Sequence, residues 1–126
     1  MSIKAQPVAA ALGAEITGVE LGGPLSQAQC QAIADALVEH QVIFFRDQDI
    51  SAQDHRELAR WFGDLQTHPA YPTVDGFPEV TILEYNREKR SKIELWHTDM
   101  TFRKRPPLGT ILVGRVVPKT GGDTMF

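Results

Sequence analysis

The chain has 126 residues, enough for one small domain and too few for two of ordinary size. Hydrophobic residues make up 42% and charged residues 23%, a balance typical of globular proteins, and the formal net charge of −3 argues against a nucleic-acid partner. The longest apolar runs are far too short to cross a membrane, and the N-terminal stretch lacks the apolar core of a signal peptide. Cys30 is the single cysteine and cannot form an internal disulfide, so we expect a cytoplasmic protein.

The first third of the chain predicts two short strands and a helix. Strand-like runs cover residues 3–8 and 14–19, with a turn-prone Gly between them. Ser26 is a typical helix N-cap, and Gln29 three residues later completes a capping box. The helix is expected to end near His40. Its predicted apolar face consists of Cys30, Ile33, Ala34, Leu37 and Val38.

A strand and a second helix are expected next. The β-branched and aromatic run 42–45 is too short for a helix and predicts a buried strand. The second helix is expected to begin at Ser51, with Asp54 as the acid of another capping box. It is expected to end at Gly63, because glycine is common directly after a helix.

The remainder of the chain predicts strands and loops. Residues 80–83 and 110–117 have strand character, the second run being the best strand candidate in the sequence, and the charged run 86–92 indicates an exposed loop. Residues 121–126 resemble a turn followed by the start of a strand, which indicates that the chain stops inside a larger domain. Helices come early and strands later, so we expect an α+β, mainly β fold with helices packed on a sandwich or open barrel.

His97 and Asp99 are the candidate metal ligands. Extended or tightly turned backbone between them would let both side chains meet at one ion, since positions i and i+2 of a strand share a face. An imidazole with a carboxylate suits iron(II), manganese or zinc, and a second His would complete a facial triad with three open positions for a 2-oxo acid and dioxygen. A structural zinc site normally uses several cysteines, and Cys30 stands alone. Because this spacing often arises by chance, a zinc-dependent hydrolase using the same pair stays open as an alternative.

Six motifs occur in order along nearly the whole chain. They are GAEITG at 13–18, VIFFRDQ at 42–48, FGDL at 62–65, HPAYP at 68–72, WHTDMTF at 96–102 and GGDT at 121–124. In order and spacing they resemble the taurine dioxygenase family of iron(II)/2-oxoglutarate oxygenases, which includes the 2,4-dichlorophenoxyacetate dioxygenases. Several motifs in sequence are far more specific than any one of them.

The resemblance implies a fold and a cofactor site. The fold would be a double-stranded β-helix, or jelly roll, with flanking helices, and residues 1–126 would be the N-terminal part of a single domain. His97 and Asp99 would be catalytic iron(II) ligands, and Thr124 would donate a hydrogen bond to the distal carboxylate of 2-oxoglutarate. The second His ligand and the 2-oxoglutarate arginine would follow the GGDT motif, outside this sequence. Three histidines do not match the distal ligand: His40, His55 and His68.

The resemblance also implies a substrate side of the site. His68 and Tyr71 match positions that contact the sulfonate in taurine-specific members, although His68 could also be a loop residue packed on the barrel mouth. Met100 and Phe102 would line the pocket. Ile93 stands where taurine-specific members have a polar amide, which argues against taurine because an aliphatic side chain cannot hydrogen-bond its polar groups.

We therefore expect a dioxygenase that uses iron(II), 2-oxoglutarate and O2 to hydroxylate a small, anionic substrate. A sulfonate or an alkyl sulfate is expected, with succinate and CO2 as the other products. The alternative is a non-catalytic remnant or interaction domain, because these 126 residues supply neither the second His ligand nor the 2-oxoglutarate arginine. The fragment alone is expected to be inactive, and a homo-oligomer is left open. The basic run 103–105 is expected to be plain surface.

Overall fold

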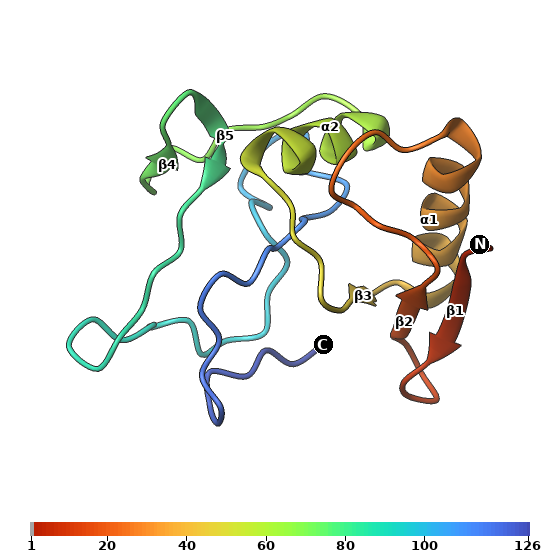
Figure 1. The fold of residues 1–126 in the computed structure, drawn as a ribbon. Helices are drawn as coiled ribbons and strands as arrows, with labels where there is room; N and C mark the ends of the chain where they lie inside the picture. The colour runs from red at the N-terminus through yellow and green to blue at the C-terminus, as the bar shows by residue number, and fades with distance from the viewer. Residues whose placement is uncertain (1) are drawn as a thin grey trace.

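The computed structural model describes residues 2–126, and its N-terminal half is built on a small sheet (Figure 1). Strand β2 (Ala14–Thr17) lies in the centre of this sheet. It pairs antiparallel with β1 (Lys4–Pro7) and parallel with β3 (Ile43–Phe45). Helix α1 (Gln27–His40) makes the crossover that the parallel pair requires. The expected strands and helix of this half are confirmed, although β3 is half-buried rather than buried.

The core lies between this sheet and the two helices, α1 and α2 (Ala52–Phe62). Ile33 on α1 is its most deeply buried large side chain, at 2% exposure. The prediction that Val38 shares this face is wrong: Val38 is 83% exposed, and the buried residue is Ala36. At about 100° per residue, Val38 lies roughly 140° around the helix from Ile33, whereas Ala36 lies about 60° away. The buried members of the core are Ala14, Ile16, Val19, Leu21, Ile33, Ala36, Ile50 and Leu58.

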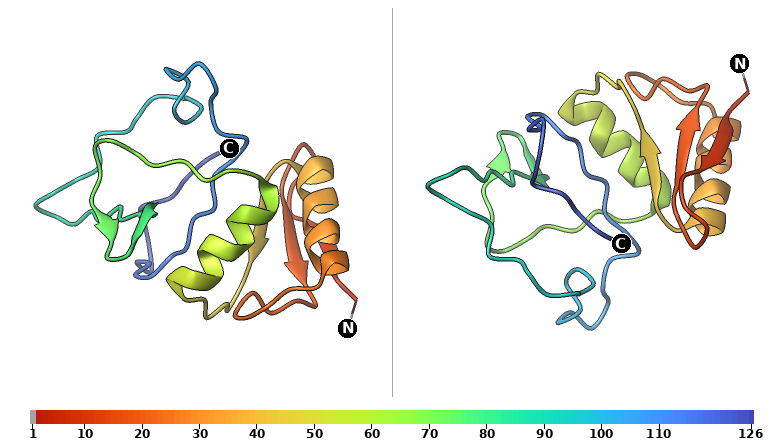
Figure 2. Two further views of the ribbon diagram at one scale, coloured as in Figure 1. Left: turned by 90° about the horizontal axis from the view of Figure 1, so that it is seen from above. Right: turned by 90° about the horizontal axis from the view of Figure 1, so that it is seen from below.

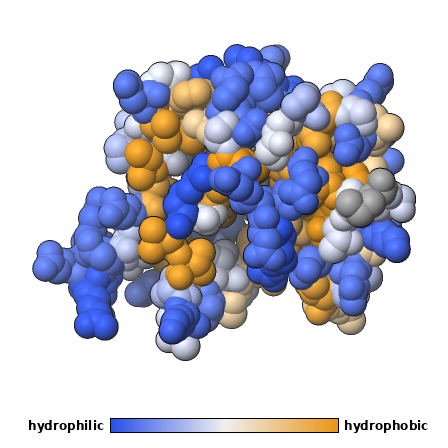
Figure 3. Space-filling model, in the orientation of Figure 1, coloured by the Kyte–Doolittle hydropathy of each residue, from blue (hydrophilic) through white to orange (hydrophobic). Residues whose placement is uncertain are grey.

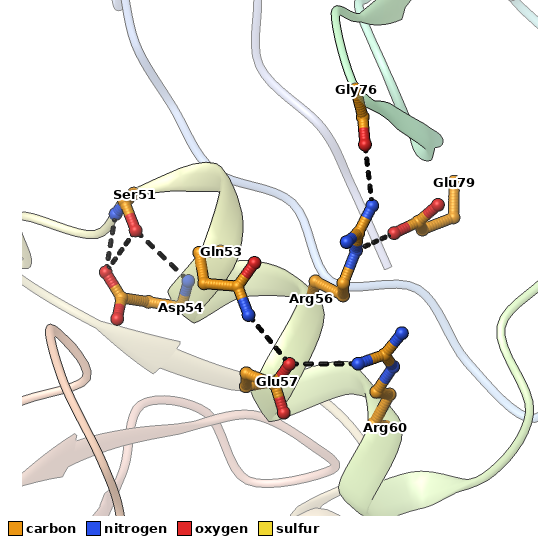
Figure 4. Close-up of polar contacts among 8 residues, drawn as sticks. All are labelled: Ser51, Gln53, Asp54, Arg56, Glu57, Arg60, Gly76 and Glu79. Carbon is orange, nitrogen blue, oxygen red and sulfur yellow. Dashed lines mark hydrogen bonds and ion pairs between the residues drawn. The ribbon is translucent and has the colours of Figure 1, made fainter.

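Both helices begin with the capping boxes that the sequence predicts. At the start of α1, the Gln29 N–H donates to the Ser26 hydroxyl at 3.2 Å, and the Ser26 N–H donates to the Gln29 side chain at 2.9 Å. At the start of α2, Ser51 and Asp54 make the same reciprocal pair, which Figure 4 shows. These bonds satisfy backbone donors that have no partner inside a helix.

Arg56 joins α2 to the small hairpin that follows it, formed by β4 (Thr73–Val74) and β5 (Phe77–Thr81) (Figure 4). Its guanidinium pairs with Glu79, donates to the Gly76 carbonyl oxygen at 2.9 Å and lies 4.2 Å from the centre of the Phe77 ring. The ion pair is mostly buried, so its loss would leave a charge without a partner in the interior. The hairpin is thereby fixed to α2.

Protonation of Asp54 is expected to weaken the start of α2 in acid. Hydrogen bonds from the Ser51 side chain and backbone, and a weaker one from the Gly23 N–H, hold the pKa of Asp54 below its ordinary value of 3.8. A depressed folded pKa gives stability that is complete above 3.8 and is lost as the pH falls through the lower folded value. Asp54→Asn should therefore flatten part of the acid slope in urea unfolding followed from neutral pH to about pH 2. Asp75→Asn, on an exposed turn, is the control and should leave the slope unchanged.

The prediction of a strand-rich C-terminal half is wrong for the described residues. The strand expected at 80–83 lies earlier, as β5, and residues 110–117 and 123–126 form no strand within residues 2–126. Strand propensity is realised only when a neighbouring strand takes up the backbone hydrogen bonds, and none lies beside 110–117 in this part of the chain. A side chain, rather than a strand, contacts the backbone of this run: His55 Nε2 lies 2.9 Å from the Ile111 carbonyl oxygen. The observed architecture is mixed α/β with two small sheets.

The loops of the C-terminal half lie beside α2, on the side away from α1 (Figure 2). Many of their apolar side chains are exposed, and apolar patches interrupt the polar surface on the face shown in Figure 3. Within residues 2–126, no helix has the length and apolar character needed to cross a bilayer. The exposed apolar residues after position 100 are Phe102, Leu108, Leu112, Val116, Val117, Met125 and Phe126.

Candidate functional site

His97 and Asp99 point toward one another, as their spacing predicts. The distance from His97 Nε2 to Asp99 Oδ1 is 3.3 Å, and both side chains are about half exposed. His97 Nδ1 lies 2.8 Å from the Leu95 carbonyl oxygen. A carbonyl oxygen can only accept, so Nδ1 carries a proton, and Nε2 of the corresponding neutral tautomer has a lone pair that could bind a metal ion.

This pair fits two positions around one metal ion. Donors bound at about 2.1 Å lie about 3.0 Å apart at a right angle and about 3.4 Å apart in a tetrahedron, and the observed separation falls between these values. A neutral imidazole nitrogen and a carboxylate oxygen form the donor set that suits iron(II), manganese or zinc. Within residues 2–126, no group of three or more such side chains could hold a metal. Residues 2–126 therefore contain two candidate ligands that converge, and no third beside them.

Neither candidate ligand lies in a strand: His97 is in irregular backbone, and a turn begins at Asp99. The Arg103 N–H donates to the Met100 carbonyl oxygen at 3.1 Å, and Met100 has a positive φ of 54°. The Thr110 hydroxyl donates to Asp99 Oδ2 at 3.3 Å, which leaves Oδ1 for the histidine side. Sequence reasoning did not single out Thr110, because its contact with Asp99 has no local pattern to reveal it.

His68 and Tyr71, which the resemblance assigns to substrate binding, lie side by side. Their ring centres lie 4.6 Å apart with the planes tilted by 49°. The Ala70 N–H donates to His68 Nδ1 at 3.1 Å, so in the neutral ring the proton lies on Nε2. His68 can therefore donate one hydrogen bond through Nε2 even without a positive charge.

The environment of Tyr71 includes Tyr85 and, more weakly, Asp99. The neighbouring Tyr85 phenol, through its charge and its hydrogen bond, raises the pKa of Tyr71; partial burial and the negative charge of Asp99 add to the effect. A phenol with a raised pKa stays protonated near neutral pH and remains a hydrogen-bond donor. Sequence reasoning missed Tyr85, because the β4–β5 hairpin separates it from Tyr71 along the chain.

The other predicted site residues differ in burial. Met100 is half-buried in the turn that follows Asp99, whereas Phe102 and Thr124 are exposed. Within residues 2–126, no hydrogen bond or ion pair joins Thr124 to His97 or Asp99. Their roles in binding stay predictions.

Comparison with known proteins agrees with the resemblance. Residues 4–126 match the family described as taurine catabolism dioxygenase TauD, TfdA family. The chain is 40% identical over 116 residues to an alkylsulfatase of Acinetobacter baylyi, and the alignment covers 91% of the chain and 36% of that protein. It is 39% identical over 127 residues to an alpha-ketoglutarate-dependent sulfate ester dioxygenase of Pseudomonas putida, covering 100% of the chain and 42% of that protein.

A solved structure supports the same relationship. The crystal structure of a taurine dioxygenase from Burkholderia xenovorans superposes with a TM-score of 0.57 at 35% identity, over 62% of this chain and 28% of that one. The chain spans less than half the length of the two curated relatives named above.

Proposed function

Because the chain belongs to the taurine catabolism dioxygenase TauD, TfdA family, we propose that it forms the N-terminal part of an iron(II)- and 2-oxoglutarate-dependent dioxygenase acting on alkyl sulfates. The observation that carries the proposal is the convergence of His97 Nε2 and Asp99 Oδ1 at 3.3 Å. Alpha-ketoglutarate, in the name of the Pseudomonas putida relative, is the same compound as 2-oxoglutarate. We further propose that residues 1–126 belong to a single jelly-roll domain, as is typical of the family.

The metal would be held by the two converging donors and by a second histidine supplied by the rest of the domain. Iron(II) with bound 2-oxoglutarate would supply the activation of O2 for C–H hydroxylation, with succinate and CO2 released. Thr110 orients the Asp99 carboxylate by binding Oδ2. Thr124 would donate to the distal carboxylate of 2-oxoglutarate, where an arginine would supply most of the charge recognition.

The substrate anion would be held by neutral donors. His68 Nε2–H and the Tyr71 hydroxyl lie on adjacent rings and can both donate to sulfate oxygens. Met100 and Phe102 flank the ligand turn and would contact the alkyl chain. Hydroxylation at the carbon that bears the sulfate gives a product that breaks down to an aldehyde and inorganic sulfate.

An alkyl sulfate is favoured over taurine for two reasons. Ile93 offers no hydrogen bond to an amino group, and an aliphatic chain requires none. The relatives at 39–40% identity are named as an alkylsulfatase and a sulfate ester dioxygenase. These names, both of enzymes, also disfavour a non-catalytic interaction domain.

The test is substrate-dependent succinate release by the complete gene product, supplied with iron(II), 2-oxoglutarate and O2. A panel would contain an alkyl sulfate, the alkylsulfonate of the same chain length, taurine and an aryloxyacetate. We expect the alkyl sulfate to give succinate, aldehyde and sulfate in equal amounts, with less turnover of the other three. Sulfate release that persists without 2-oxoglutarate and O2 would instead establish a hydrolase, the zinc alternative.

A further inference from the structure

Arg103 joins two loops that carry the two halves of the candidate site. Its Nη1 donates to the Gln66 side-chain oxygen at 3.2 Å, and its Nη2 donates to the Thr67 carbonyl oxygen at 2.7 Å. These acceptors lie 37 and 36 residues away along the chain. The expectation that residues 103–105 are plain surface is therefore wrong for Arg103, which is half-buried.

A third hydrogen bond joins the same two loops, this time donated by Gln66. The Gln66 side-chain amide donates to the Arg105 carbonyl oxygen at 3.4 Å, so Gln66 both receives from and donates to the turn that follows the metal ligands. The backbone of this turn is itself closed by the Arg103 N–H, which donates to the Met100 carbonyl oxygen. One residue of each loop thus binds two positions of the other.

The hydrogen bonds between the two loops connect residues that adjoin the two halves of the candidate site. Thr67 directly precedes His68, and Met100 directly follows Asp99. The segment from 64 to 72 has no helix or strand to fix it, apart from its hydrogen bonds. The distance from His68 and Tyr71 to the proposed metal ligands therefore depends on contacts between these two loops. The guanidinium makes the shortest of the three hydrogen bonds, to Thr67.

We propose that Arg103 is a positioning residue, which holds the His68–Tyr71 segment at a fixed place relative to His97 and Asp99. It acts on the substrate only through that segment. The identification of the substrate rests on the proposed function, whereas the connection between the loops does not. The planar guanidinium suits this task, because its separate N–H groups reach a side-chain and a backbone acceptor at once, which a lysine ammonium does less well.

Amide hydrogen exchange in the complete gene product tests the connection without any activity. Arg103→Met keeps the length of the side chain and removes the donors. Peptides that cover residues 66–72 should then exchange about tenfold faster, since the loop loses its charge-assisted hydrogen bonds. Arg105→Met is the matched control: it removes the same charge two residues away from an exposed side chain and should leave exchange unchanged. Arg103→Lys should restore only part of the protection.

Steady-state kinetics tests the consequence for the substrate. For Arg103→Met we expect the KM for the alkyl sulfate to rise about tenfold while kcat stays within about twofold, because binding geometry is lost and the metal ligands remain. A fall in both kcat and the melting temperature, with an unchanged KM, would show a merely structural role and overturn the proposal. Unchanged exchange at 66–72, or full recovery with lysine, would also overturn it. If exchange rises as expected but the unaltered protein releases no succinate with any substrate, the connection stands and the proposed function fails.

Discussion

Replacing His97 by alanine is expected to abolish metal-dependent turnover by the complete gene product. The imidazole is one of the two donors that converge within residues 2–126, so its loss would leave Asp99 as the single proposed ligand from this part of the protein. Activity should fall by more than about a hundredfold, because even a residue that only supports a ligand costs about ten- to a hundredfold when removed. The measurement is succinate release at saturating iron(II) and 2-oxoglutarate.

Absorption without oxygen provides an independent measure of the same change. The unaltered protein should develop a weak visible charge-transfer band when iron(II) and 2-oxoglutarate are added anaerobically, and His97→Ala should not. His40→Gln is the control, because His40 lies at the end of α1 and should leave both band and turnover intact. Persistence of the band in His97→Ala would remove His97 from the metal site.

Truncation of Ile33 to alanine is expected to have the largest effect on stability. Ile33 is 2% exposed at the centre of the core between the first sheet and the helices. Removing a buried branched side chain leaves a cavity and costs about 2–5 kcal/mol in the free energy of unfolding. Urea unfolding followed by circular dichroism would measure the change.

Val38→Ala on the same helix separates burial from helix propensity. Val38 is 83% exposed, so its truncation should change the free energy of unfolding by less than about 0.5 kcal/mol. Similar losses for the two variants would contradict the placement of Ile33 in the core.

The N-terminal half was predictable because its signals are local. A capping box lies within four residues, and the apolar spacing of α1 spans a few turns, so each can be recognised without knowledge of the fold. Residues 110–117 show the opposite case: their strand propensity is real, but a strand forms only beside a partner, and none lies there among residues 2–126.

The candidate site likewise contains features that the sequence predicts and features that it does not. The spacing of two residues predicts that His97 and Asp99 converge, whereas His68 and Tyr71 are paired through the resemblance to the family. The residues that orient these pairs come from farther along the chain. Arg103 reaches acceptors more than thirty residues away, and no local pattern marks it as different from the lysine and arginine that follow.

The run from 110 to 117 also bears on self-association. Ile111 and Val113 pack against the core, but the run pairs with no strand within residues 2–126, and Val116 is 94% exposed. A strand-forming segment without a partner strand is a template to which another polypeptide can add. The sequence carries its own protection against this. Arg115 interrupts the run with a charge that is held by the Ile50 carbonyl oxygen at 2.7 Å, and Pro118 ends it with a residue that has no N–H to donate. Such gatekeeper residues restrain intermolecular strand pairing while the segment is uncovered.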